Sequence, residues 1–213
     1  MAARDYGQYC GITRALELVG ERWALLLVRD LLVGPRRYGE LAAGLPRIPT
    51  NVLAARLKEL QAAGIIRRAP RSRVIVYELT PYGRELEPVV LALGAWGFKA
   101  MGDPRDEQVV TPDALTMTLR TAFRRDVAAT LPATAYAAHV GDAGLLVRVD
   151  GPSLAVTRGD GPVDLSFAAS PDLHRVISGA LSPDRAIATG VVEVLHGPGD
   201  LLSRFATTFH LAA

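Results

Sequence analysis

The sequence predicts an α+β protein in two parts, an N-terminal winged helix-turn-helix domain and a C-terminal α+β domain with a mainly antiparallel sheet. The chain has 213 residues, more than the ~100–150 that are typical of one domain. In the first half, short helical patterns precede one basic hairpin, whereas helices frame several strand-like runs in the second half. The polar segment GDPRDEQVVTP separates the two patterns. We therefore expect domains at residues 1–102 and 112–213.

The N-terminal part has the element order of a winged helix. Apolar residues recur at three- and four-residue steps in its helical segments, and Gly20 is the expected break in the first of them. Gly64 ends the helix before the hairpin, and Thr80-Pro81 begins the helix after it. The expected helices are Thr13–Val33, Tyr38–Ala43, Thr50–Ala63 and Pro81 to about Met101. The expected hairpin strands are Ile65–Ala69 and Val74–Leu79.

The predicted helix Thr50–Ala63 has the pattern of a DNA recognition helix. On a helical wheel one face carries Leu53, Leu57 and Leu60, and the opposite face carries small and polar residues. Small residues let a helix enter the major groove, where an asparagine can bind adenine with two hydrogen bonds. We therefore expect DNA contacts from the residues Thr50, Asn51, Ala54, Ala55 and Lys58.

Basic residues cluster around this helix. Residues 1–100 contain 15 Lys and Arg against 9 Asp and Glu, whereas residues 101–213 contain 9 against 13. A basic first half attracts phosphate, and an acidic second half indicates a different partner. The arginines that we expect to contact DNA are Arg36, Arg37, Arg47, Arg71 and Arg73. The alternative interpretations are a solvated basic face and a winged helix that binds another protein.

Motifs between Cys10 and Trp96 resemble the HxlR-type winged-helix transcription regulators. They are Arg22-Trp23, Gly34, Arg37-Tyr38-x-Glu40-Leu41, Leu53-x-x-Arg56-Leu57-x-x-Leu60-x-x-x-Gly64 and Tyr77-x-Leu79-Thr80-x-x-Gly83. The resemblance implies a homodimer built by the N-terminal and post-wing helices. It also implies an inverted-repeat operator in double-stranded DNA, with half-sites ~10 bp apart or a multiple of that. The family usually has Ser-Pro where this chain has Pro49-Thr50, so we expect Thr50 to cap a helix that starts one residue later.

Cys10 is the only cysteine, so the chain has no internal disulfide framework. It stands where many members of this family carry an N-terminal cysteine, which some use as a redox sensor. Thiol redox sensing through Cys10 is therefore an alternative function, and a buried small residue near the dimer interface is the plainer interpretation. The cysteine content and the absence of an export signal and of a membrane-spanning run favour a cytoplasmic protein without a membrane partner.

The second part alternates helices, strands and turns. Glycine-rich turns such as Gly159-Asp160-Gly161-Pro162 separate the strand-like runs, which indicates mainly antiparallel pairing. The expected helices are Pro112–Thr130, Pro171–Ser178, Pro183–Ala188 and Pro198–Phe209. The expected strands are Thr134–Val140, Gly144–Val149, Ser153–Thr157, Val163–Ala168 and Val191–Leu195.

The sequence shows no catalytic or metal-binding pattern. Its four histidines are scattered, and the sequence has no second cysteine that could help to bind a metal. Gly-x-Ser-x-Gly and a phosphate-binding glycine loop are both missing. We therefore expect no enzyme activity, no catalytic residue, no metal and no cofactor.

Motifs between Ala114 and Leu211 resemble the sterol-carrier-protein type-two-like domain. They are Asp164-x-Ser-Phe, Ser170-Pro-Asp-Leu173, Gly179-x-Leu181-x-Pro183-x-x-Ala186-x-x-x-Gly190-x-Val192-x-Val194 and Gly197-x-x-x-Leu201-Leu202-x-x-Phe205. The resemblance implies a tunnel for apolar molecules that the C-terminal helix partly covers. From apolarity and position we expect the ligand to contact Phe167, Leu181, Phe205 and Phe209.

Together these patterns predict a DNA-binding transcription regulator whose C-terminal domain senses an apolar small molecule. The alternative of a different class is a lipid or metabolite carrier that uses the winged helix only as a dimerisation scaffold. The substitutions Arg71→Glu and Arg73→Glu discriminate between these two functions, because only a regulator would lose DNA binding.

Overall fold

The computed structural model describes residues 5–212. These residues form two compact units, one that extends to Val90 and one that starts at Leu91. Among the described residues, no helix is long and apolar enough to cross a membrane.

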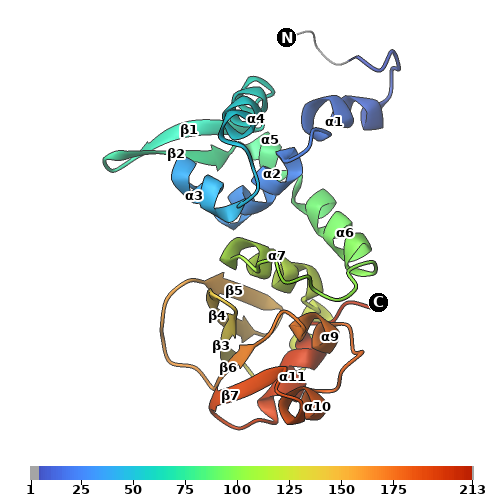
Figure 1. Ribbon diagram of the computed structural model, residues 1–213, viewed down its shortest axis with the longest axis vertical. Helices are drawn as coiled ribbons and strands as arrows, with labels where there is room; N and C mark the ends of the chain where they lie inside the picture. Colours follow the sequence, from blue (N-terminus) through green and yellow to red (C-terminus); the bar gives the residue numbers. More distant parts are fainter. Residues whose placement is uncertain (1–4, 213) are drawn as a thin grey trace. The chain divides into compact units, whose positions relative to one another are not determined.

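In the N-terminal unit, helices precede a two-stranded hairpin (Figure 1). Leucines from α2, α3 and α4 form its centre, and Leu27, Leu41 and Leu53 have no exposed surface. The first helical segment is interrupted after Val19, so the predicted break near Gly20 is confirmed. The elements are α1 (Gly11–Val19), α2 (Ala24–Val33), α3 (Tyr38–Gly44), α4 (Thr50–Ala62), β1 (Ile66–Arg71), β2 (Val74–Leu79) and α5 (Pro81–Arg84).

The hairpin is the wing of the N-terminal unit. Its strands pair antiparallel from Ile66 opposite Leu79 to Arg71 opposite Val74. Ser72 makes the tight turn possible by adopting a φ of 56°, a left-handed conformation that non-glycine residues seldom adopt outside turns. The segment before α3 adds to the wing, because Arg36 and Tyr77 exchange backbone hydrogen bonds of 3.0 and 2.8 Å.

The motif Thr80-x-x-Gly83, which follows the wing, has a structural explanation, because Thr80 bonds both to the end of α4 and to the start of α5. The Thr80 hydroxyl donates a hydrogen bond to the Gly64 carbonyl (2.6 Å) and accepts one from the Gly83 amide (3.0 Å). Gly83 is buried, and a Cβ there would overlap the carbonyl oxygen of Ile65. Threonine and glycine at these two positions therefore join the end of α4 to the start of α5.

The predicted single helix from Pro81 to about Met101 is wrong. α5 ends at Arg84, and α6 runs from Glu87 to Phe98. Pro88 explains the interruption, because it has no amide hydrogen to bond the carbonyl of Arg84. The division between the compact units falls within α6, and Phe98 packs in the core of the second unit. The domain limits 1–102 and 112–213 stay a prediction, which limited proteolysis would test.

The C-terminal unit contains a mixed sheet with the strand order β5-β4-β3-β6-β7. β3 and β6 are parallel, and the other neighbouring strands are antiparallel. The strands are β3 (Thr134–Val140), β4 (Ala143–Asp150), β5 (Ser153–Thr157), β6 (Leu165–Ala169) and β7 (Val192–His196). The helices from Pro112 on are α7 (Pro112–Ala122), α8 (Arg125–Ala128), α9 (Leu173–Ile177), α10 (Pro183–Ala188) and α11 (Leu201–Thr208).

The predicted helix Pro112–Thr130 is also interrupted. α7 ends at Ala122, and Phe123 takes up an extended conformation in which it forms an antiparallel bridge with Phe209. The rings of these two residues lie 5.8 Å apart. A contact with a residue distant in sequence therefore overrides the local helical pattern.

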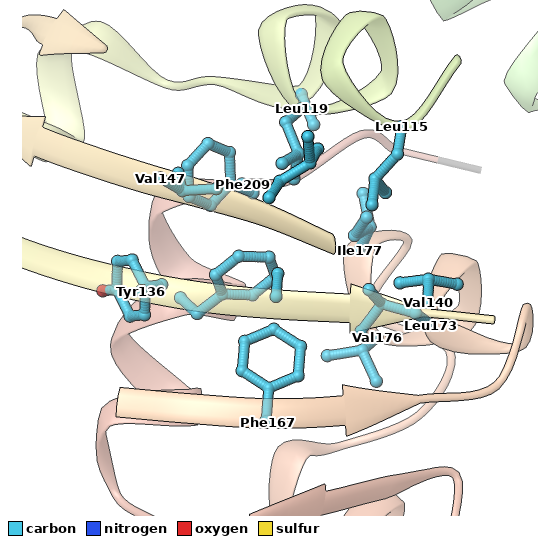
Figure 2. Close-up of a cluster of buried hydrophobic side chains, with 14 of the residues drawn as sticks. Leu115, Leu119, Tyr136, Val140, Val147, Phe167, Leu173, Val176, Ile177 and Phe209 are labelled. Carbon is cyan, nitrogen blue, oxygen red and sulfur yellow. The ribbon is translucent and has the colours of Figure 1, made fainter. Parts of the chain in front are cut away.

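The core of the C-terminal unit lies on one face of the sheet, which α7, α9 and α11 cover (Figure 2). Inward-facing strand residues alternate with partly exposed ones, as the burial along β3 shows, and this is the pattern of a sheet with one buried face. The Phe205 ring lies 5.3 Å from Tyr136, 5.2 Å from Phe167 and 4.7 Å from Phe209. Burial in this aromatic cluster raises the pKa of Tyr136 to about 12.

Candidate nucleic-acid interface

The recognition helix α4 begins at Thr50, and Pro49 is the residue before it. The prediction that Thr50 caps the helix is therefore wrong. Pro49 has φ −64° and ψ 140°, which suits a residue just outside a helix, and its carbonyl accepts the Leu53 amide at 2.9 Å. The Tyr38 hydroxyl donates to the Thr50 carbonyl at 3.1 Å. This contact fixes the first turn of α4, which contains Asn51, against α3.

The buried face and the exposed face of α4 are nearly those that the helical wheel predicts. Leu53, Leu57 and Leu60 are buried. Among the residues expected to contact DNA, Ala55 is partly buried, whereas the others on this helix are exposed: Thr50, Asn51, Ala54 and Lys58. This exposed surface is polar or small, as entry into a major groove requires. The free amides of the first turn add an anion-binding end to it.

Arg56 lies on α4 but does not belong to this exposed face. Its guanidinium forms ion pairs with Glu21, at 3.1 Å, and with Glu59. The Arg56 side chain is only 12% exposed. Arg56 therefore joins α4 to the segment before α2, and Lys58 is the exposed cation of the helix.

One buried carboxylate organises the wing. Glu78 forms ion pairs with Arg67, at 2.7 Å, and with Arg71, at 2.9 Å. Hydrogen bonds from Arg71 and then Arg67 hold the pKa of Glu78 below its ordinary value. The charge of Arg71 is thus partly balanced within the protein, although its side chain is 63% exposed. Sequence reasoning did not identify Glu78, but the hairpin register, which sets it opposite Arg67, is a signal that could have done so.

Two exposed arginines of the wing are not paired with any acidic group of the described chain. Within residues 5–212, the side chains of Arg68 and Arg73 have no hydrogen-bonding or ionic partner, and both are exposed. Arg73 lies in the turn of the hairpin and Arg68 on β1. Arg73 was expected to contact DNA, whereas Arg68 was not among the arginines named for that role.

The remaining arginines of the predicted interface lie on the segments around α3. Arg36 donates from its guanidinium to the Pro35 carbonyl at 3.0 Å. Arg37 precedes α3, and its amide donates to the Glu40 carboxylate at 2.6 Å. Arg47 is exposed in the connection from α3 to α4. The predicted DNA-binding residues therefore come from the α2–α3 connection, the α3–α4 connection, α4 and the wing.

Cys10 is exposed at the N-terminal end of α1. The backbone amides of Thr13 and Ile12 lower the pKa of its thiol. Such a thiol is more readily ionised than an ordinary cysteine.

α1 and α6 each carry apolar side chains that the described chain leaves exposed. On α1 the exposed fractions are 73% for Ile12 and 49% for Leu16. On α6 they are 52% for Val89, 47% for Leu93 and 74% for Trp96. The spacing of four and three residues places the three α6 side chains on one face of the helix.

The residues predicted to bind an apolar ligand do not line one described cavity. Phe167, Phe205 and Phe209 are fully buried and pack with one another in the core (Figure 2 labels Phe167 and Phe209). Leu181 lines a surface cavity of about 370 Å³ beside α10 and α11, together with Arg124 and His210. Sequence reasoning missed both of these residues. They meet only because Phe123 pairs with Phe209, for which the local sequence carries no signal.

No cluster of three or more His, Cys, Asp and Glu side chains that could hold a metal ion occurs in the part of the chain that the structure describes.

A family model described as HxlR-like helix-turn-helix matches residues 18–104. A relative described as an uncharacterized HTH-type transcriptional regulator of Synechocystis is 36% identical over 96 residues, which are 44% of this chain and 71% of the relative. YvaP, described likewise, from Bacillus subtilis, is 37% identical over 86 residues, 39% of this chain and 80% of the relative.

A regulator of the same description from Mycobacterium tuberculosis is 42% identical over 96 residues, 44% of this chain and 60% of that protein. Among solved structures, an HTH-type transcriptional regulator named ytcD is 33% identical over 44% of this chain and 99% of that chain, with a TM-score of 0.41. The redox regulator HypR in its oxidized form is 33% identical over 45% of this chain and 100% of that chain, with a TM-score of 0.41.

Proposed function

The chain belongs to the HxlR family of helix-turn-helix transcriptional regulators, and from this premise we propose that it binds operator DNA as a homodimer and responds to a small molecule through its C-terminal unit. The observation that carries the proposal is the exposed face of α4, with Asn51, Ala54 and Lys58, in a unit whose wing carries the unpaired cations Arg68 and Arg73. Small residues and Asn51 suit base contact, and the cations suit phosphate.

The dimer is proposed to form through the apolar faces of α1 and α6. Side chains such as Ile12 and Trp96 are 73% and 74% exposed in the single chain, and apolar residues gathered on one helix face are a usual mark of a protein interface. A two-fold dimer presents two copies of α4. It therefore fits an inverted repeat with half-sites ~10 bp apart, or a multiple of that, on one side of the DNA.

The C-terminal unit is proposed to hold the effector. Its resemblance to sterol-carrier-like domains stays a prediction, and the support for a ligand is the cavity that Leu181 lines. An effector changes DNA affinity only if it binds the two states of the regulator differently. Coupling of ~1–3 kcal/mol would change operator affinity about 5–150-fold.

A mobility shift with the promoter fragment from the protein's own locus tests this function. We expect specific binding that weakens as salt rises and that Arg73→Glu reduces strongly. Arg175→Glu, which changes an exposed arginine of the C-terminal unit, is the matched control and should bind like the wild type. If the wild type shows no specific, salt-sensitive DNA binding and still binds an apolar ligand, the carrier with a winged-helix scaffold is the better description.

The exposed Cys10 supports a second candidate function, thiol sensing. Its lowered pKa favours the reactive thiolate. Under this proposal, an oxidant weakens operator binding by the wild type but not by Cys10→Ser, in the same mobility-shift assay. An identical response of the two proteins would exclude Cys10 as the sensor.

A further inference from the structure

The cavity beside α10 and α11 combines positive charge with apolar walls. Its volume of about 370 Å³ falls within the ~300–1,000 Å³ of small-molecule sites. Its lining includes the guanidinium of Arg124 and the imidazole of His210, and none of the lining side chains that the structure describes is acidic. Hydroxyl groups and apolar side chains make up most of the remainder: Ser182, Ser203, Thr207, Val176, Leu181 and Ala206.

Backbone hydrogen bonds hold Arg124 and His210 in place. The Arg124 amide donates to the Thr208 carbonyl at 2.9 Å, and the His210 amide donates to the Ala122 carbonyl at 2.8 Å. Within residues 5–212, neither the guanidinium of Arg124 nor the imidazole of His210 has a hydrogen-bonding or ionic partner. Both groups are therefore available to a ligand in the cavity.

The chain also makes room for the imidazole. The Leu211 amide donates to the Ile177 carbonyl at 3.0 Å, which fixes the backbone on the other side of His210. Gly179 lines the cavity with φ +76°, and a Cβ there would lie 3.2 Å from Cε1 of His210. A larger residue at 179 would be strained and would crowd the ring.

The charge of this cavity does not follow from the composition around it. Residues 101–213 contain 9 Lys and Arg against 13 Asp and Glu. An unpaired guanidinium beside an unpaired imidazole, in one cavity of an acidic segment, is a specific arrangement. A carboxylate between them would accept charge-assisted hydrogen bonds, which are stronger than neutral ones.

We propose that this cavity binds a small amphipathic carboxylate, with the carboxylate against Arg124 and His210 and the hydrocarbon along Leu181 and Ala206. Its regulatory meaning rests on the proposed effector role of the C-terminal unit, whereas the binding itself is measured separately. Ser203, an exposed residue of α11 that lines the cavity, would offer its hydroxyl as a further donor to the same carboxylate.

Isothermal titration of the full chain with octanoate tests the site, with 1-octanol and acetate as matched probes that lack the charge or the hydrocarbon. Octanoate should bind at least about tenfold more tightly than either. Arg124→Gln should weaken octanoate binding roughly tenfold, the loss of one charge-assisted hydrogen bond. Arg125→Gln, which changes the adjacent exposed arginine outside the cavity, should bind as the wild type does. Ser203→Phe, which places a ring in the cavity, should abolish binding.

Different failures have different meanings. Equal affinity for octanoate and 1-octanol, or equal losses in Arg124→Gln and Arg125→Gln, would overturn the anionic site. No octanoate binding by a protein that still binds its operator would overturn the site and leave the DNA-binding function standing. Octanoate binding that leaves operator affinity unchanged would support the site and contradict the effector role.

Discussion

At the scale of single residues, the interface separates groups that face outward from groups that hold the fold. Lys58 and Arg56 lie two positions apart on α4, yet Lys58 is exposed and Arg56 is paired with Glu21 and Glu59. The same division appears in the wing, where Glu78 engages Arg67 and Arg71 and leaves Arg73 without a partner. Sequence position alone does not distinguish these arginines, because the ion pairs depend on the folded hairpin.

Two substitutions on α4 should separate base recognition from phosphate binding. Asn51→Ala should cost ~1–3 kcal/mol of discrimination at one base pair. Lys58→Ala should weaken binding to all sequences and reduce the slope of log affinity against log salt by ~0.9. Fluorescence anisotropy over a salt series measures both, with Lys99→Ala, an exposed lysine after α6, as the control. Equal effects of Lys58→Ala and Lys99→Ala would contradict this role of α4.

Glu78 makes the stability of the wing depend on pH. Its native pKa lies below the ordinary glutamate value because Arg71 and Arg67 stabilise the carboxylate. The stability that it contributes is therefore present above the ordinary pKa and is lost as pH falls through the lowered native value. Thermal unfolding should show Glu78→Gln less stable than the wild type at pH 7, with the difference disappearing in acid. Glu85→Gln, at an exposed position after α5, should show no such convergence, and a constant Glu78→Gln difference from pH 7 to pH 3 would refute the ion-pair explanation.

At the scale of elements, the helices and strands that local patterns specify could be predicted, as could the break near Gly20, whereas the end of α7 could not. The leucine spacing of α4 and the turn between β1 and β2 are local signals, and both elements form. The turn is shorter than the expected residues 70–73, because β1 continues through Arg71. The end of α5 has a local signal in Pro88, which the sequence prediction missed, whereas the end of α7 has none. Phe123 leaves a helical pattern in order to pair with Phe209, and only the tertiary structure contains that information.

Gly83 gives the junction between β2 and α5 a measurable requirement. A methyl group at this position would meet the Ile65 carbonyl oxygen, so Gly83→Ala should lower the free energy of unfolding by about 1–3 kcal/mol, as overpacking does. Gly39→Ala is the matched control, because nothing lies within 4 Å of a Cβ on Gly39. Chemical denaturation measures both variants. A Gly83→Ala protein as stable as Gly39→Ala would show that the junction can move.

At the scale of the whole molecule, family membership accounts for the N-terminal unit and leaves the C-terminal unit to its own chemistry. The family model ends at residue 104, and the predicted apolar-ligand residues divide between the core, which holds Phe167, Phe205 and Phe209, and the cavity, which Leu181 lines. Apolarity in the sequence cannot separate these two places, because a core and an apolar pocket need the same side chains.

The proposed dimer can be dissociated at α6. Leu93→Glu combined with Trp96→Glu puts charge on an exposed apolar face, where it would be buried unpaired in a dimer. Sedimentation equilibrium should show a dimer for the wild type and a monomer for this variant. Leu195→Glu, which changes an apolar side chain that is 53% exposed on β7, should remain dimeric. A double variant that is still a dimer would place the interface elsewhere.

The central claim is that two copies of α4 read one operator, and a DNase footprint on the promoter of the protein's own locus tests it most directly. We predict two protected half-sites related by a two-fold axis, with centres ~10 bp or a multiple of that apart, and loss of protection with Asn51→Ala at the lowest concentration at which the wild type protects. The account would be contradicted if the wild type gave no protection at low salt, or if Asn51→Ala protected the same bases as the wild type.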